Sequence, residues 1–272
     1  MGGMLTSRSL APLACALALA VAGCAQVSPA PAPTPDRPQP AASGTPTQAA
    51  PTPSTTPSPT PTPTSEPERL TITVSGDLLW HKGLLADAAQ AGKDVGAAYD
   101  FVPVFEHIRP LIEDADVSIC HVEVPVAPPG VKPVGYPVFA APPETIEAAK
   151  EVGFDYCTTA SNHTFDQGMA GIDATLDALD AAGIVHTGAY REQADVGKPA
   201  ILTTASGVKV AVVAGAYGSN LKAPGGRTWA LDLLDAEAMV ARGEAAREAG
   251  ADIVLAAMHA GTEQQHQPNG QQ

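Results

Sequence analysis

Four polar side chains that can bind a metal ion follow apolar, strand-like runs of this sequence. They are Asp77, Glu123, Asn162 and His259. Oxygen and imidazole ligands without a thiolate suit hard or borderline cations such as Mn²⁺, Fe or Zn²⁺. Each residue also has an ordinary structural explanation: Asp77 as a helix N-cap, Glu123 as a solvated loop charge, Asn162 as a turn cap and His259 as a core histidine. A metal site therefore requires a fold that brings the four together.

Apolar runs alternate with helical patterns from about residue 70 onward, which is typical of an α/β domain. The expected strands are residues 70–75, 116–121, 154–158, 184–187, 200–204, 208–214 and 253–258. The expected helices are residues 103–113, 144–152, 169–182 and 231–248. Ser206-Gly207 between two of the strands predicts a hairpin, so the sheet is expected to be mixed. Ligands of such folds bind beyond the carboxyl ends of the strands, where the four candidates lie.

Sequence blocks around these residues resemble those of the CapA family. The blocks are Gly76-Asp77, His121-Val122-Glu123-Val124-Pro125, Ser161-Asn162-His163-Thr164-Phe165-Asp166-Gln167-Gly168, Ile184-Val185-His186-Thr187-Gly188 and His259-Ala260-Gly261-Thr262-Glu263. From about Leu70 to Gln272, the chain thus resembles capsule or poly-γ-glutamate synthesis proteins of the calcineurin-like metallophosphoesterase superfamily. The resemblance implies a mixed-sheet α/β sandwich of the metallophosphoesterase type.

The resemblance also implies a two-metal site. Asp77 would bind one ion, Glu123 would bind or bridge, and Asn162 and His259 would bind the second ion. His163 would be the general acid near the leaving group, and the nucleophile would be a metal-activated hydroxide. The implied function is an exported, metal-dependent phosphoesterase-like hydrolase of capsule or poly-γ-glutamate biosynthesis. The alternative is a non-catalytic envelope factor that binds a polyanionic polymer or a synthase partner.

The sequence departs from the family pattern at three places. His121 stands where the family usually has Asn, and Ala260 stands where it usually has Trp. His121 is an extra ligand, a substrate contact or a tolerated exchange, and we favour the exchange. The family's Gly-His-His-Pro-His-like segment, which supplies further ligands, has no counterpart after His259, because His266 is the only later histidine. We therefore expect a truncated, poorly active chain whose fold is incomplete at the C-terminus.

The N-terminal third has the organisation of an exported, lipid-anchored protein. Residues 1–23 form a predicted lipoprotein signal peptide, in which an apolar run precedes Val21-Ala22-Gly23 and Cys24. Acylation of Cys24 would tether the protein to the extracytoplasmic face of the cell membrane. Residues 24–68 are a Pro/Thr-rich spacer that is expected to be disordered, extended and polyproline-like. Residues 69–272 form the CapA-like metallophosphoesterase domain.

Charge and cysteine content limit the partners of that domain. The formal charge is -14, of which -1 falls in residues 1–68, so the domain carries -13. Such an acidic surface disfavours nucleic acid and anionic lipid as partners, but a site that contains metal ions still accepts an anionic substrate. The capsule or polyglutamate synthesis machinery is the expected protein partner. Cys120 and Cys157 are interpreted as buried free thiols, although neighbouring parallel strands would permit a disulfide.

Overall fold

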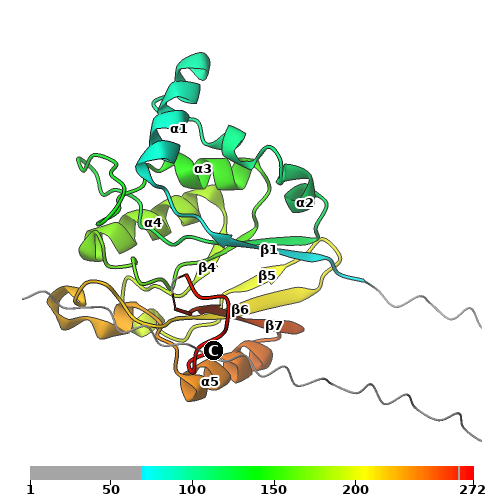
Figure 1. The fold of residues 1–272 in the computed structure, drawn as a ribbon. Coiled ribbons are helices and arrows are strands. Elements are labelled where there is room, and N and C mark those ends of the chain that lie inside the picture. The colour runs from blue at the N-terminus through cyan, green and yellow to red at the C-terminus, as the bar shows by residue number, and fades with distance from the viewer. Residues whose placement is uncertain (1–68, 263) are drawn as a thin grey trace, which may run out of the picture. The chain divides into compact units, whose positions relative to one another are not determined.

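The structure, a computed structural model, describes residues 69–262 and 264–272. The predicted signal peptide and the whole of the spacer, Cys24 included, lie outside the described residues, as does Glu263. The described part is an α/β domain in which two β-sheets lie face to face and helices cover the outer face of each sheet (Figure 1). None of its helices is long and apolar enough to cross a membrane.

The first sheet is parallel, with the strand order β1-β2-β3-β4. Its strands are β1 (Ile72–Asp77), β2 (Val117–His121), β3 (Tyr156–Thr158) and β4 (Val185–Thr187). Every residue of β2 and β3 is buried except His121, which is half-buried. Strands covered on both faces are mostly apolar, and the buried Ser118 hydroxyl of β2 is satisfied by donating to the Ile112 carbonyl at 2.7 Å.

The second sheet is mixed and has the order β5-β6-β7. Its strands are β5 (Ile201–Thr203), β6 (Lys209–Ala216) and β7 (Ile253–His259). The predicted hairpin is confirmed, because β5 pairs with β6 in antiparallel register. β7 runs parallel to β6. The expected mixed pairing is thus present, and it is confined to this second, smaller sheet, because the first sheet is parallel.

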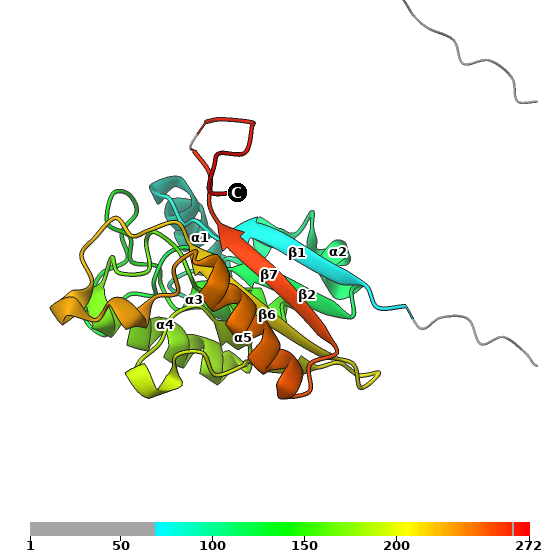
Figure 2. The same ribbon diagram turned by 90° about the horizontal axis from the view of Figure 1, so that it is seen from below.

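The longer helices divide between the two outer faces. They are α1 (Lys82–Val95), α2 (Arg109–Glu113), α3 (Glu144–Glu151), α4 (Gly168–Ala182) and α5 (Ala236–Glu248). Short 3₁₀ helices lie at Val102–Phe105, Gln193–Asp195, Pro224–Gly226 and Thr228–Ala230. Helices α1 to α4 cover the first sheet, and α5 lies along β6 and β7 of the second (Figures 1 and 2).

Two expected helices have different bounds in the structure. The helix expected over 103–113 is split into the Val102–Phe105 3₁₀ helix and α2, because Pro110 lacks the N–H that would continue the hydrogen-bond ladder. The helix expected from residue 231 begins only at Ala236, where Asp235 accepts a hydrogen bond from the Ala238 N–H at 2.8 Å. Leu231 instead bridges to Ala189, after β4.

Apolar side chains from both sheets fill the space between them. Val117, Ile119 and Tyr156 of the first sheet pack with Val210 and Val212 of the second. A larger core lies between the first sheet and its helices, and it includes residues of α1, α3 and α4. The two sheets therefore have a shared core, and the ends of their strands are held in fixed relation.

Cys120 and Cys157 form a disulfide, so the interpretation as free thiols is wrong. They are register partners on the neighbouring strands β2 and β3, with their Cα atoms 4.5 Å apart. This separation lies within the range that a disulfide spans. The cross-link therefore joins the two central strands one residue before His121 and Thr158.

Candidate metal centre

Three candidate ligands meet where strands of both sheets end. Asp77 is the last residue of β1, His121 is the last of β2, and His259 is the last of β7. Asp77 and His121 are register partners, and β7 brings His259 beside them from the second sheet. One ligand atom of each residue lies within 4.8 Å of the other two. The convergence of side chains at the strand ends, expected from the fold class, is present.

The spacing within this group leaves room for an ion. The Asp77 Oδ1 atom lies 3.6 Å from His259 Nδ1 and 3.8 Å from His121 Nε2. The two imidazole rings are stacked, with their centroids 4.9 Å apart. Hydrogen bonds to nitrogen in proteins are about 2.7–3.2 Å long, so neither contact of Asp77 is a hydrogen bond of normal length. Ligands of one ion, each about 2.0–2.2 Å from it, have a similar mutual separation.

Hydrogen bonds on the far side of each ring leave a nitrogen facing Asp77. His121 Nδ1 is 2.7 Å from Thr158 Oγ1, and His259 Nε2 is 2.9 Å from Asn162 Oδ1. Because Asn162 Oδ1 only accepts, His259 must donate from Nε2, which leaves Nδ1 as the lone-pair atom toward Asp77. If His121 donates to Thr158 from Nδ1 in the same way, its Nε2 atom also keeps a lone pair that faces Asp77. Such outer hydrogen bonds orient metal-binding histidines.

Two buried polar atoms of this centre lack a hydrogen-bond partner. They are His121 Nε2 and Glu123 Oε2. A buried polar atom without a partner costs about 1–3 kcal/mol, so a native structure rarely keeps one without a reason. The other Glu123 oxygen, Oε1, lies 4.0 Å from His259 Nε2. An imidazole nitrogen and a carboxylate oxygen are both groups that bind metal ions, so the residues present fit a metal site.

His163 lies beside this group on a loop after β3. Its Nδ1 atom is 2.7 Å from Asp166 Oδ2, and its Nε2 atom is 3.3 Å from Asn220 Nδ2. The Asp166 oxygen also accepts a hydrogen bond from the Phe139 N–H at 2.7 Å. The Phe139 ring meets the imidazole edge-on, with centroids 4.8 Å apart. His163 is thus held firmly in one orientation, which suits a group that transfers a proton.

The charges of the centre change the pKa of three groups. Interaction with His259 lowers the pKa of Asp77, although burial acts in the opposite direction, and His121 lowers it further. Burial lowers the pKa of His121 to about 4, and repulsion from His259 adds to this. Burial also raises the pKa of Glu123 to about 6, and Asp77 contributes to the increase. At neutral pH, His121 is therefore an uncharged imidazole, the form that binds metals.

The family comparison agrees with the sequence blocks. The family model described as "Bacterial capsule synthesis protein PGA_cap" matches residues 71–272. The chain belongs to this family, the CapA family of capsule and poly-γ-glutamate synthesis proteins. No curated protein matches the chain. The matched span covers every described strand and helix, so the candidate metal centre is part of the CapA-family domain.

A cavity of about 570 Å³ opens onto the centre of this CapA-family domain. Asp77, Glu123, Asn162 and His259 all line the cavity, so four of the five predicted site residues share one space. His163 is not among its described lining residues. The role of each residue stays a prediction, because proximity does not assign one.

Three further residues lie at this site; sequence reasoning weighed His121 and noted His266 but missed Tyr217. His121, favoured as a tolerated exchange, is one of the three grouped ligands. Tyr217 stacks on His259 at 5.9 Å, and its N–H donates to the His259 carbonyl at 2.9 Å. His266 lines the cavity from an exposed loop. Tyr217 follows β6 directly, so its place after a strand was the only signal in the sequence.

Two other histidines, His81 and His186, have ordinary surroundings. His81, four residues after Asp77, is exposed and precedes α1, where it contacts Tyr136 and Phe139. His186 lies 3.0 Å from Asp180 on the surface of α4. Asp77 is not a helix N-cap, because α1 begins only at Lys82. The alternative structural explanation for Asp77 is therefore wrong.

Proposed function

We propose that this CapA-family protein is a metal-dependent, phosphoesterase-like hydrolase of the metallophosphoesterase fold type. One observation carries the proposal: Asp77, His121 and His259 present ligand atoms within 4.8 Å of one another, and the buried His121 Nε2 atom has no hydrogen-bond partner. Two imidazoles and carboxylates suit Zn²⁺, Fe or Mn²⁺. The face-to-face sheets with outer helices support the fold assignment.

Asp77, His121 and His259 would hold one ion, and Glu123 would take part in holding a second. Asn162 would bind that second ion only after its Oδ1 atom gives up the hydrogen bonds from His259 and Ser161. When bound, such ions supply positive charge to an anionic centre and a water of lowered pKa. The cavity beside these residues receives the substrate. The ions also offset the domain charge of -13, which would otherwise repel a phosphate ester.

His163 would protonate the leaving group from Nε2. Its Nδ1 donates to Asp166 at 2.7 Å, and the carboxylate stabilises the imidazolium that must form before this proton is given up. The Asn220 amide nitrogen, 3.3 Å from Nε2, can only donate to it, so this contact must break when Nε2 takes up the proton. This role requires substrate to reach the Asn220 side of the ring.

Metal content and turnover of purified variants test the proposal. Asp77→Ala and His121→Ala are expected to weaken metal affinity more than tenfold, because each removes a direct ligand. His163→Ala should retain metal but lose hydrolysis of an aryl phosphate or phosphodiester. His186→Ala is the matched control, since that histidine bonds Asp180 away from the centre. Full metal content in the Asp77 and His121 variants would overturn the proposal.

We also propose that the protein is anchored by a lipid at Cys24 on the extracytoplasmic face of the cell membrane. The signal-like residues 1–23 and the spacer support this placement. Cys24→Ser should abolish labelling by a radioactive fatty acid and release the protein from membranes. Unchanged membrane retention in this variant would contradict the anchor.

A further inference from the structure

A cavity larger than the one at the metal centre lies in another part of the described domain. It is a groove of about 1150 Å³ between α3, α4 and the loop of residues 126–143. Neither Asp77, His121 nor His259 lines it. Pockets for small ligands usually measure about 300–1,000 Å³, so this groove is large enough for a segment of another macromolecule.

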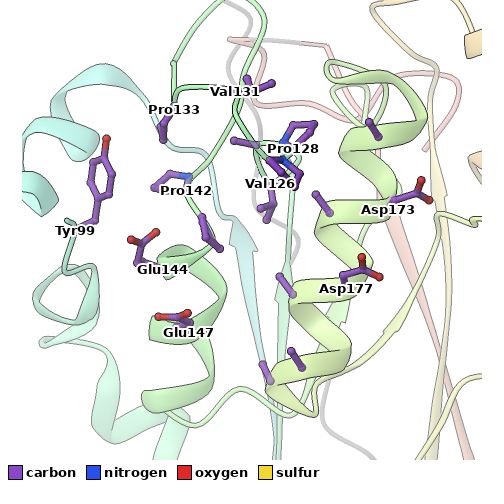
Figure 3. Close-up of a pocket in the computed structure, with 18 of the residues that line it drawn as sticks. Tyr99, Val126, Pro128, Val131, Pro133, Pro142, Glu144, Glu147, Asp173 and Asp177 are labelled. Atoms are coloured by element: carbon purple, nitrogen blue, oxygen red, sulfur yellow. The ribbon is translucent and has the colours of Figure 1, made fainter. Parts of the chain in front are cut away.

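The floor of the groove is apolar and built from small or rigid residues. On the α4 side, this floor is a row of alanines formed by Ala170, Ala174, Ala178 and Ala181. Their spacing of three and four residues places them along one face of the helix. Proline rings of the loop, including Pro128 and Pro133, form the opposite wall (Figure 3). Short side chains let another helix approach the backbone of α4 closely.

Acidic side chains lie along both sides of this floor. Glu144 and Glu147 project from α3, and Asp173 and Asp177 project from α4 (Figure 3). Asp177 is already 2.8 Å from Arg191, but no described cation pairs with Glu147 or Asp173. Glu144 has a buried oxygen, Oε2, without a hydrogen-bond partner. Lys150 also lines the groove, but the carboxylates outnumber it, so the groove offers net negative charge to a partner.

We propose that this groove binds a basic amphipathic helix of a partner protein. An apolar helix face would lie on the alanine row, and Lys or Arg side chains at its two edges would reach the acidic residues of α3 and α4. Charge complementarity excludes anionic lipid, nucleic acid and a polyglutamate chain as occupants. Addition of a β-strand is also disfavoured, because the walls are helices and a loop rich in proline, which cannot donate backbone hydrogen bonds.

A designed peptide tests this proposal on the full chain. The probe is a fluorescent helical peptide of roughly 18 residues, with Leu at positions spaced by three and four and Lys on either side of the Leu stripe. This is the pattern of an amphipathic surface helix. A second peptide carries Glu in place of every Lys. Fluorescence anisotropy should show binding of the Lys peptide only, with affinity that decreases as salt concentration rises. No binding of the Lys peptide, or equal binding of both peptides, would overturn the proposal.

Variants separate the groove from the general acidity of the domain. E147K/D173K should weaken binding about tenfold or more, because both residues flank the floor. The control E244K/E248K makes the same change in charge on the exposed face of α5 and should stay within about twofold of wild type. Equal weakening in the two variants would mean nonspecific attraction, which overturns the proposal.

A second pair of variants tests the floor independently of charge. Ala170→Trp fills one end of the groove at an exposed helix position and should weaken binding at both low and high salt. Ala241→Trp on α5 is the matched control and should leave binding unchanged. Circular dichroism and metal content confirm that each variant is folded. Unaltered binding by Ala170→Trp would show that the probe does not occupy the groove.

Discussion

Two clusters of polar side chains lie where the two sheets meet, and only in one of them is the central carboxylate paired at hydrogen-bond distance. In the first cluster, Tyr190 Oη donates to Asp232 Oδ2 at 2.7 Å, and Arg242 Nη2 lies 2.6 Å from Asp232 Oδ1. In the second, the contacts of Asp77 with His121 and His259 are 3.8 and 3.6 Å. The first has hydrogen-bond distances, whereas the second has a gap at its centre.

The two clusters also differ in whether their buried carboxylate and imidazole atoms have hydrogen-bond partners. The Asp232 N–H donates to the Gly188 carbonyl after β4, and the Asp232 carbonyl accepts from Ala216 of β6. Both carboxylate oxygens are satisfied, and only Arg242 Nη1 lacks a partner. The Asp232 cluster therefore acts as a structural joint between the sheets. The Asp77 cluster has the buried, unpartnered atoms that a bound cation would satisfy.

The largest expected effect comes from removing the ion pair of the Asp232 cluster. Arg242→Met removes the cation of Asp232, whose side chain is only 2% exposed, and leaves a buried charge without compensation. Loss of one partner of a buried ion pair costs about 3–5 kcal/mol of unfolding free energy. Urea unfolding measures it.

Arg247→Met on the same helix is the control, since Arg247 is exposed and should change stability by less than about 0.5 kcal/mol. Equal stability of the two variants would remove the distinction between the clusters, because Asp232 would then need no partner.

Loss of the disulfide should have the next largest effect on stability. The disulfide lies one residue before His121, at the metal centre. Cys120 and Cys157 are 37 residues apart in sequence, and closing such a loop stabilises a protein by about 2–4 kcal/mol. A reducing agent should therefore lower the melting temperature of wild-type protein. The C120A/C157A variant should melt at a lower temperature whether or not the reductant is present. A wild-type melting temperature that is unaffected by full reduction would contradict this expectation.

Removal of the metal should lower the stability of the protein only through the cluster of Asp77, His121 and His259. An ion held by Asp77 and His121 of the first sheet and His259 of the second links the sheets, so it stabilises the folded state. At a metal concentration one hundred times the Kd, this linkage is about 2.7 kcal/mol. Chelation should lower the stability of wild type and of Arg242→Met by the same amount, and leave His259→Ala unchanged. A chelator effect that persists in His259→Ala would place the ion elsewhere.

Local patterns in the sequence were sufficient for most of the fold. Helix α4 was predicted to within one residue, because Ile172, Leu176 and Leu179 have helical spacing and Gly183 ends it in a left-handed conformation. Helix α1 was not predicted. Its buried residues are Leu85, Ala88 and Gly92, and small residues on the inner face conceal the apolar period.

The candidate site was predictable only in part, because it depends on register between strands. Asp77, Glu123, Asn162 and His259 were recognisable from their places after strands and from the family blocks. The place of His121 among the ligands depends on Thr158 opposite it and on His259 from the other sheet. The disulfide likewise depends on register, since a shift of one residue between β2 and β3 would remove the pairing of Cys120 with Cys157.

The smallest expected effect concerns Gly188, which lies between the two clusters. Its carbonyl accepts from the Asp232 N–H, and a Cβ at this position would lie 2.6 Å from the Ala160 nitrogen, two residues before Asn162. Its φ of 113° is also in a region that other residues rarely adopt. Gly188→Ala should therefore combine backbone strain with a steric clash. Gly197→Ala is the matched control, because Gly197 has a φ of 79° but open space around its Cβ position.

The difference in unfolding free energy between these two variants isolates the clash, and we expect about 1–2 kcal/mol. Because the clash pushes on the segment that carries Asn162, Gly188→Ala should also weaken metal binding, whereas Gly197→Ala should not. Chemical denaturation and metal titration of both variants measure the two effects. If Gly188→Ala lost stability without any change in metal affinity, the two clusters would be mechanically independent, and the shared core would not transmit displacement from one to the other.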